Sequence, residues 1–251
     1  MSQLKKAQDF KALHVKGQPV VLYNIWDAGG AKALVDAGAK AVATGSWSVA
    51  AAQGYKDGEA IPLDFVLQIV NRIAETVDVP LSVDFEGAYA SDPETVTQNV
   101  RKIIQAGAIG INFEDQRVGG DGLHAIDEQV ARIKAVRQAA ELEGIPLFIN
   151  ARTDLFLKAG ASDHTGLLDE ALTRGAAYAE AGADGFFVPA LTDHALIKSV
   201  CETSSIPVNV MMRGALTSLQ AAVELGVSRA SYGPGPYANA MTDLVERYKG
   251  L

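Results

Sequence analysis

Short apolar runs recur along the chain, and they begin in two alternating ways. One kind of run follows a proline, at Pro19, Pro80, Pro146 and Pro207. The other kind follows a glycine, at Gly38, Gly107, Gly182 and Gly226. Glycine just past a helix supplies the left-handed residue that ends it, and proline at the first residue of a strand removes no ladder hydrogen bond. The pattern therefore predicts eight strands.

The segments between the runs have helical spacing. In the clearest case the apolar residues of one face are Val66, Ile69, Val70, Ile73 and Val77. Asp92, Pro93 and Glu94 have the arrangement of a helix start, with a capping side chain, proline in the first turn and an acid beside it. Helices are therefore expected between the predicted strands.

Strand and helix alternate eight times over 251 residues, which is the size and rhythm of a (β/α)8 TIM-type barrel. We expect one α/β barrel domain over residues 1–251, with an extra helix at residues 2–13. A doubly wound open sheet is the competing fold. It normally has a G-x-G-x-x-G turn after its first strand, and residues 26–30, Trp-Asp-Ala-Gly-Gly, do not match that pattern.

Composition and charge limit the kinds of partner and the cellular compartment that we expect. With 22 basic and 30 acidic residues, the net charge is −8, which argues against nucleic acid and anionic membranes as partners. A single cysteine, Cys201, excludes a disulfide framework and a thiolate zinc cluster, and we expect it to be a buried filler. The absence of an apolar signal core or a run of about 20 apolar residues favours a cytoplasmic protein.

In such a barrel the chemistry collects where the strands end. Three successive strand ends carry acids, with Asp84 and Glu86, then Glu114, then Asp154, and the last of these ends also carries Arg152. Carboxylates at one rim repel each other unless a cation or a shared proton compensates them. Their hard oxygens favour Mg²⁺ or Mn²⁺. Alternatively, the acids are helix caps or ion-pair partners of the arginines.

Several motifs at these strand ends resemble the isocitrate lyase / phosphoenolpyruvate mutase superfamily. Its D-x-D-x-G-Y-G motif corresponds to residues 84–90, Asp-Phe-Glu-Gly-Ala-Tyr-Ala, and its E-D-[QK] motif to residues 114–116. A small-residue loop at residues 45–48 precedes a G-x-x-D turn at residues 54–57. The strands around Arg152 and Asn209 also match.

The resemblance implies an Mg²⁺-dependent lyase for small 2-oxo or 2-hydroxy carboxylic acids, acting through a pyruvate-type enolate. The implied metal ligands are Asp84, Glu86 and Glu114. Asp57, Glu114 and Arg152 are the implied catalytic residues. The implied substrate-binding residues are Gly45, Ser46, Trp47, Arg152 and Asn209. Mn²⁺ could replace Mg²⁺, and a homodimer or homotetramer is expected, in which the C-terminal helix could be exchanged between subunits.

Departures from the family pattern leave several reactions possible. Glu86 stands where aspartate is usual, and the loop after Glu114 lacks the lyase cysteine. The favoured reaction is carbon–carbon cleavage, as in an oxaloacetate decarboxylase or 2-methylisocitrate lyase. The alternatives are a carbon–phosphorus enzyme, similar to phosphonopyruvate hydrolase or phosphoenolpyruvate phosphonomutase, and a barrel that binds a metal or oxyacid without catalysis.

Other candidate residues carry less weight. His124 lies in the loop after Glu114. We expect it to be a solvated loop residue rather than a proton donor near the site. The remaining histidines, at positions 14, 164 and 194, are expected at the surface. A Schiff-base aldolase would need a lysine at a strand end, and the candidates Lys56 and Lys158 lie in predicted loops.

Overall fold

The computed structural model describes residues 1–251 and contains eight strands that alternate with helices. The strands are β1 (Val20–Leu22), β2 (Val42–Ala43), β3 (Leu81–Asp84), β4 (Gly110–Glu114), β5 (Phe148–Arg152), β6 (Gly185–Phe187), β7 (Val208–Met211) and β8 (Arg229–Ser231). Every pair is parallel, in the order β1-β8-β7-β6-β5-β4-β3-β2. The predicted TIM-type barrel is confirmed.

The sheet closes between β1 and β2 through one parallel bridge, which joins Ile25 to Thr44. Asn24 reinforces this closure with its side-chain amide. Its Nδ2 donates to the carbonyl of Thr44 at 2.8 Å, and its Oδ1 accepts the N–H groups of Tyr232 at 3.0 Å and Gly233 at 2.8 Å. One side chain thus joins the carboxyl ends of β1, β2 and β8.

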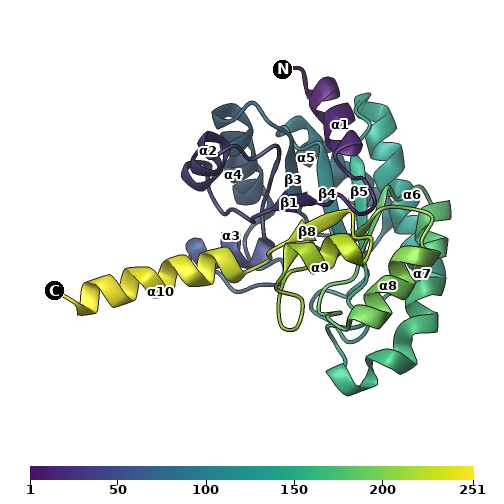
Figure 1. The fold of residues 1–251 in the computed structure, drawn as a ribbon. Coiled ribbons are helices and arrows are strands. Elements are labelled where there is room, and N and C mark those ends of the chain that lie inside the picture. Colours follow the sequence, from purple (N-terminus) through teal and green to yellow (C-terminus); the bar gives the residue numbers. More distant parts are fainter.

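Helices surround the barrel (Figure 1). They are α1 (Gln3–Ala12), α2 (Ala28–Asp36), α3 (Ser46–Ala52), α4 (Leu63–Thr76), α5 (Pro93–Gln105), α6 (Ile126–Glu143), the 3₁₀ helix η1 (Ala161–Leu167), α7 (Leu168–Glu180), α8 (His194–Thr203), α9 (Leu219–Glu224) and α10 (Gly235–Lys249). The predicted extra helix is α1. The last helix, α10, extends away from the barrel (Figure 1).

Helix α5 shows how the local sequence determines an element. The carboxylate of Asp92 accepts the N–H of Thr95 at 2.8 Å, and Pro93 occupies the first turn. The helix buries its apolar face, made of Val96, Val100, Ile103 and Ile104. Gly107 then ends it with a φ of 108°, and a Cβ there would lie 2.5 Å from the Cβ of Ala74. Only glycine fits this position.

The interior of the barrel changes from apolar at its amino end to polar toward its carboxyl end. The amino end is filled by Ala7, Phe10, Val20, Leu22, Ala41, Ala43, Ile109 and Phe148. Phe10 of α1 closes this end, and Gly110 makes room for it, since a Cβ there would lie 3.1 Å from the Phe10 ring. The buried polar side chains above this layer are Ser82, Asn112, Asn150, Asn209, Arg229 and Ser231. Barrel interiors are usually dominated by branched apolar residues.

Two histidines expected at the surface are buried. The ring of His14 stacks on Phe148 with centroids 4.1 Å apart, and its Nδ1 donates to a main-chain carbonyl at 2.8 Å. His164 packs edge to face against Phe156, with ring centroids 5.1 Å apart, and its Nε2 lies 3.0 Å from the carbonyl of that residue. The burial of His14 is not visible in the local sequence, because Phe148, on which its ring stacks, is supplied by a distant strand. Cys201 is buried, as predicted.

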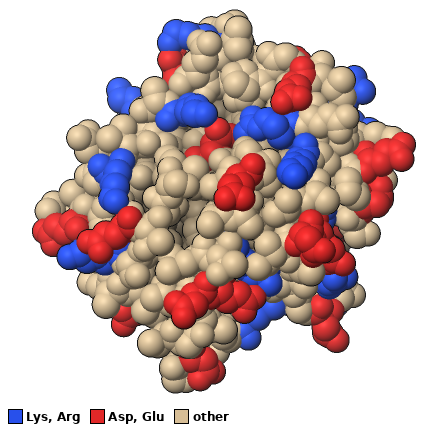
Figure 2. Space-filling model, turned by 90° about the vertical axis from the view of Figure 1, so that its right-hand side faces the viewer, with Lys and Arg blue, Asp and Glu red and all other residues tan.

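Charged side chains of both signs are interspersed over the face shown in Figure 2. No helix of the chain combines the length and the apolar character that crossing a bilayer requires.

Acid is expected to destabilise the protein through His14. Burial, followed by the charge of Arg229, lowers the pKa of His14 from 6.5 to about 3. The unfolded chain therefore binds a proton that the folded chain excludes. The resulting stability is present above pH 6.5 and is lost as the pH falls toward 3. At about pH 5 the loss is roughly 2 kcal/mol.

Urea denaturation near neutral pH and at about pH 5 measures this effect. The His14→Gln variant should lose less stability than the wild type between the two conditions. His194→Gln is the matched control, because His194 is exposed, and it should keep the wild-type dependence. Identical pH dependence in wild type and His14→Gln would refute the assignment.

Candidate active site

A cavity of about 170 Å³ opens at the carboxyl ends of the strands. The predicted site residues that line it are Gly45, Ser46, Trp47, Asp57, Asp84 and Arg152. Five further polar residues also line it: Asn24, Ser48, Asn112, Arg213 and Ser231. The predicted residues Glu86, Glu114 and Asn209 are buried and do not line it.

Asp84, the last residue of β3, is held on both of its carboxylate oxygens. Its Oδ2 accepts the main-chain N–H of Ser46 at 2.9 Å and the hydroxyl of the same residue at 2.8 Å. Its Oδ1 accepts from Nδ2 of Asn112 at 3.1 Å. These donors fix the orientation of the carboxylate at the wall of the cavity.

Arg152, at the end of β5, is the counter-ion of the acidic strand ends. Its Nη1 lies 3.0 Å from Oε2 of Glu114 and 3.8 Å from Oδ1 of Asp84. Its Nε and Nη2 donate to the two oxygens of Asp154 at 2.5 and 2.9 Å. Burial alone would lower the pKa of Arg152, but the charges of Glu114, Asp154 and Asp84 raise it above its usual value. The guanidinium is therefore already engaged by carboxylates.

Glu86 holds the loop that carries Asp57. Its carboxyl oxygens accept the N–H groups of Gly58 at 3.0 Å and of Glu59 at 3.1 Å. Glu59 reciprocates, since its Oε1 accepts the N–H of Tyr89 at 2.7 Å. Burial, followed by the charges of the neighbouring aspartates, raises the pKa of Glu86 to about 8. The longer side chain at this position thus ties two loops together.

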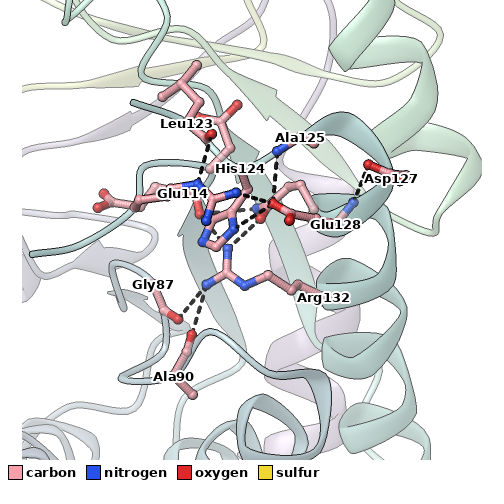
Figure 3. Close-up of polar contacts among 12 residues, drawn as sticks. Gly87, Ala90, Glu114, Leu123, His124, Ala125, Asp127, Glu128 and Arg132 are labelled. Carbon is pink, nitrogen blue, oxygen red and sulfur yellow. Dashed lines mark hydrogen bonds and ion pairs between the residues drawn. The ribbon is translucent and has the colours of Figure 1, made fainter. Parts of the chain in front are cut away.

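The turn after β3 has a strained backbone. Three of its non-glycine residues have positive φ, with 50° at Glu86, 61° at Ala88 and 56° at Tyr89. This left-handed region favours glycine, and other residues persist there only when the surroundings hold them. Arg132 of α6 supplies part of that support, because it donates to the carbonyls of Gly87 at 2.8 Å and Ala90 at 3.1 Å (Figure 3).

Two of the main-chain amides expected to bind substrate are used within the protein. The N–H of Gly45 donates to the carbonyl of Ile25 at 3.2 Å, where the barrel closes, and the N–H of Ser46 donates to Asp84. Of the predicted amides, that of Trp47 has no acceptor in the structure. The buried hydroxyl of Ser48 is also without a partner and lines the cavity. The donors that remain free for a ligand are therefore those of Trp47 and Ser48, and not the amides of Gly45 and Ser46.

Asn209 lies in the barrel interior, below the cavity. Its Oδ1 accepts the hydroxyl of Ser231 at 3.1 Å, and its Nδ2 is buried without a partner. Its predicted contact with substrate is therefore not provided by this geometry.

The loop after Glu114 folds back onto α6, and His124 is buried within it. The main-chain N–H of His124 donates to the carbonyl of Asp115 at 2.7 Å, and its Nδ1 lies 3.3 Å from Oε2 of Glu128 (Figure 3). His124 lines a second cavity, of about 390 Å³. The expectation of a solvated loop histidine was wrong, because the strand end and α6 enclose the ring.

Some residues that sequence reasoning missed carried a usable signal. Asn112 precedes Glu114 by two positions in β4, so the alternation of a strand places both side chains on the same side. Arg229 stands in the same relation to Ser231 in β8. Arg213 follows Met211 by two positions and Asn209 by four, so the alternation of β7, continued past its last residue, places Arg213 on the same side.

Comparison with known proteins identifies the family. Residues 10–251 match the model of a family described as phosphoenolpyruvate phosphomutase. The chain belongs to this family. A solved structure from Burkholderia cenocepacia, provisionally described as a phosphonomutase, is 46% identical, with a TM-score of 0.96 and coverage of 99% of both chains.

Other relatives of this phosphomutase-family protein carry different activities. The 2-methylisocitrate lyase of Escherichia coli is 31% identical over 214 residues, which cover 83% of this chain and 70% of that enzyme. A phosphonopyruvate hydrolase in complex with oxalate and Mg²⁺ shares the fold, with a TM-score of 0.84 at 23% identity and coverage of 97% and 86%. The superfamily thus includes lyases, mutases and hydrolases.

The family implies a magnesium ion, and the oxygen ligands on the cavity wall fit one in a hydrated form. The three carboxylates predicted as ligands do not converge, since Glu86 is bonded to amides and Glu114 to Arg152, and no group of three acidic, histidine or cysteine side chains is arranged for a metal. Mg²⁺ usually keeps several waters and binds one or two carboxylates. The cavity offers two, Asp84 and Asp57. Asp84 would hold the ion, with Asp57 acting through water.

Removal of the Arg152 guanidinium is expected to destabilise the fold. In Arg152→Gln, the carboxylates of Glu114 and Asp154 remain buried without a counter-ion, and the free energy of unfolding should fall by about 3–5 kcal/mol. Chemical denaturation measures this loss. Arg213→Gln is the control, because Arg213 is exposed and takes part in none of the ion pairs, and it should change stability by less than about 0.5 kcal/mol. Equal stabilities of the two variants would contradict the role of Arg152.

Proposed function

We propose that this protein is a lyase that cleaves a carbon–carbon bond in a small 2-oxo or 2-hydroxy carboxylic acid by way of an enolate and releases a 2-oxo acid of the pyruvate type. The observation that carries the proposal is the presence of a firmly oriented Asp84 carboxylate and an unpaired Arg213 guanidinium in one small cavity. The similarity to 2-methylisocitrate lyase supports carbon–carbon cleavage.

Arg213 binds the second anionic group of the substrate in this proposal. Arg152 was predicted to provide that contact, but its charge is balanced by Glu114 and Asp154. Arg213 lines the cavity and has no carboxylate partner. A guanidinium presents a planar fork that matches a carboxylate or a phosphonate. The substrate class is therefore an acid with two anionic groups.

The remaining cavity residues have separate tasks. The free N–H of Trp47 and the unpartnered hydroxyl of Ser48 donate to the substrate carboxylate nearest the 2-oxo group. Burial and the charge of Asp84 raise the pKa of Asp57, so its carboxyl group is suited to return a proton to the enolate carbon. Mg²⁺, when held by Asp84, would supply the Lewis acidity that stabilises an enolate.

A carbon–phosphorus enzyme is the second candidate. The Burkholderia cenocepacia structure provisionally described as a phosphonomutase is more similar to this chain than the lyase is, with 46% against 31% identity. The planar fork of Arg213 could hold a phosphonate as well as a carboxylate. The product released from each substrate separates the two reactions.

The test is a substrate panel of oxaloacetate, 2-methylisocitrate and phosphonopyruvate, assayed with Mg²⁺ and with excess chelator. We expect Mg²⁺-dependent release of pyruvate from a carbon substrate. Asp84→Asn should lower the rate at least about a hundredfold, since it weakens the direct metal ligand. Phosphate or phosphoenolpyruvate formed from phosphonopyruvate would establish the second candidate instead. Binding across the panel without turnover would indicate a barrel that has lost catalysis.

The C-terminal helix supports a further proposal, that the protein assembles with copies of itself. Of the residues of α10, only Pro236 is buried. The apolar residues Leu244, Val245 and Tyr248 are exposed by 60%, 46% and 76%, and their spacing places them on one face. An isolated helix of this length is marginal in water, and α10 extends away from its own barrel (Figure 1). A second copy would cover this face.

Sedimentation of the full chain measures the oligomer. We expect a dimer or tetramer, and Leu244→Glu should shift it toward monomer because the substitution places a charge on the apolar face. Glu246→Lys is the control on the opposite face and should leave the oligomer intact. A monomeric wild type would rule out this assembly.

A further inference from the structure

A buried arginine without a carboxylate partner lies in the middle of the barrel. Arg229, the first residue of β8, is 1% exposed. Its Nε lies 3.3 Å from the hydroxyl of Ser231, and its Nη2 donates to Oδ1 of Asn112 at 3.1 Å, across the barrel. Its Nη1 has no hydrogen-bond partner. Arg229 takes part in none of the ion pairs of the structure.

Such an arrangement weakens the folded state. A buried cation loses its hydration, and polar neighbours return only part of that free energy. Burial lowers the pKa of Arg229 to about 9, while the charge of Asp84 acts in the opposite direction. An apolar side chain would fill the same space in an ordinary barrel. Packing alone therefore does not explain why this position carries arginine.

The hydrogen bonds of Asn112 show what Arg229 does for the site. Oδ1 of Asn112 accepts from Arg229 at 3.1 Å and from Nδ2 of Asn150 at 2.8 Å. Both neighbours are donors, so the amide of Asn112 must turn its oxygen toward them. Its Nδ2 is then directed to Oδ1 of Asp84, at 3.1 Å. If the amide were flipped, its NH2 group would face the donors of Arg229 and Asn150, and Asp84 would face an acceptor oxygen in place of a donor.

Arg132 provides a direct comparison. It is also buried, with 2% exposure, and its bonds reach four acceptors (Figure 3). These are the carbonyls of Gly87, Ala90 and Glu114 and Oε1 of Gln129. The bonds of Arg132 connect α6 to the strained turn and to β4, so this arginine stabilises the fold. The bond from Arg229 to Asn112 leads instead toward the carboxylate on the cavity wall, and its bond to Ser231 stays within β8.

We infer that Arg229 is a positioning residue of the active site, which acts through Asn112 to orient the Asp84 carboxylate toward whatever occupies the cavity. The inference rests on the proposed function, because it takes Asp84 as the central group of the site. Arg229 does not touch the cavity, and it weakens the fold while it preorganises the site.

The test compares stability with ligand binding in the same variants. The probe is oxalate in the presence of Mg²⁺, measured by titration calorimetry, since oxalate is a planar dianion similar in shape to the enolate of pyruvate. Arg229→Met should bind oxalate about tenfold more weakly, as expected for loss of one oriented hydrogen bond to a charged group. Its resistance to urea should equal or exceed that of the wild type.

Two further variants make the comparison specific. Arg229→Lys keeps the charge and one donor to Asn112, so it should recover most of the oxalate affinity. Arg132→Met removes an arginine of similar burial and should lower stability, because it leaves buried carbonyls without donors. A purely structural role for Arg229 would instead make Arg229→Met as unstable as Arg132→Met.

The path through Asn112 is tested by a double-mutant cycle. Asn112→Ala should weaken oxalate binding by about the same factor as Arg229→Met, and the double variant should be no weaker than either single one. If Arg229→Met fails to fold, Asn112→Ala and Arg229→Lys alone carry the test. Additive effects, or wild-type affinity in Asn112→Ala, would overturn the inference. A wild type that binds no oxalate would count against the proposed function, and the inference would fall with it.

Discussion

One guanidinium, that of Arg152, holds together the acidic ends of three strands. The parallel register places Glu114 beside Arg152, and the turn after β5 returns Asp154 to the same side chain. Without a cation, buried carboxylates at this distance would repel each other and lose their hydration. The mouth of the barrel depends on this cluster. Because Arg152 is committed to it, the guanidinium that we propose for recognition of an anionic substrate is that of Arg213, which lines the cavity without a partner.

Stability and preorganisation are divided between the two ends of the barrel. At the amino end, Phe10 and Phe148 close the interior with apolar contacts. Toward the carboxyl end the interior is a network of amides, hydroxyls and Arg229, which leads to Asp84. Packed apolar side chains contribute most of the folding free energy, whereas oriented dipoles beneath a site act on the charges that form there. A layered interior allows the same barrel to do both.

Much of the fold was predictable because its signals are local. Glycine and proline mark the strand starts, and the spacing of apolar residues marks the helices. The site was predictable as a set of strand ends. The contacts that each of its residues makes were less predictable. Glu86 was expected to face a metal, but in the structure it binds the amides of Gly58 and Glu59, since the backbone at Glu86 has a φ of 50° and leaves the strand. The alternation of side chains in a strand does not predict where the side chain of a residue with left-handed backbone conformation points.

The sequence by itself determined the barrel, its extra N-terminal helix and the presence of Asp84 at the mouth, because each of these follows from short-range periodicity and from the rule that parallel strands end on one side. Only the tertiary structure decided which partner each polar group takes. Gly45 and Ser46 lost their free amides to the closure of the barrel and to Asp84, and Asn112 is oriented by Arg229, 117 residues away in the chain. Such pairings depend on distances between strands that are remote in sequence, so no local pattern encodes them.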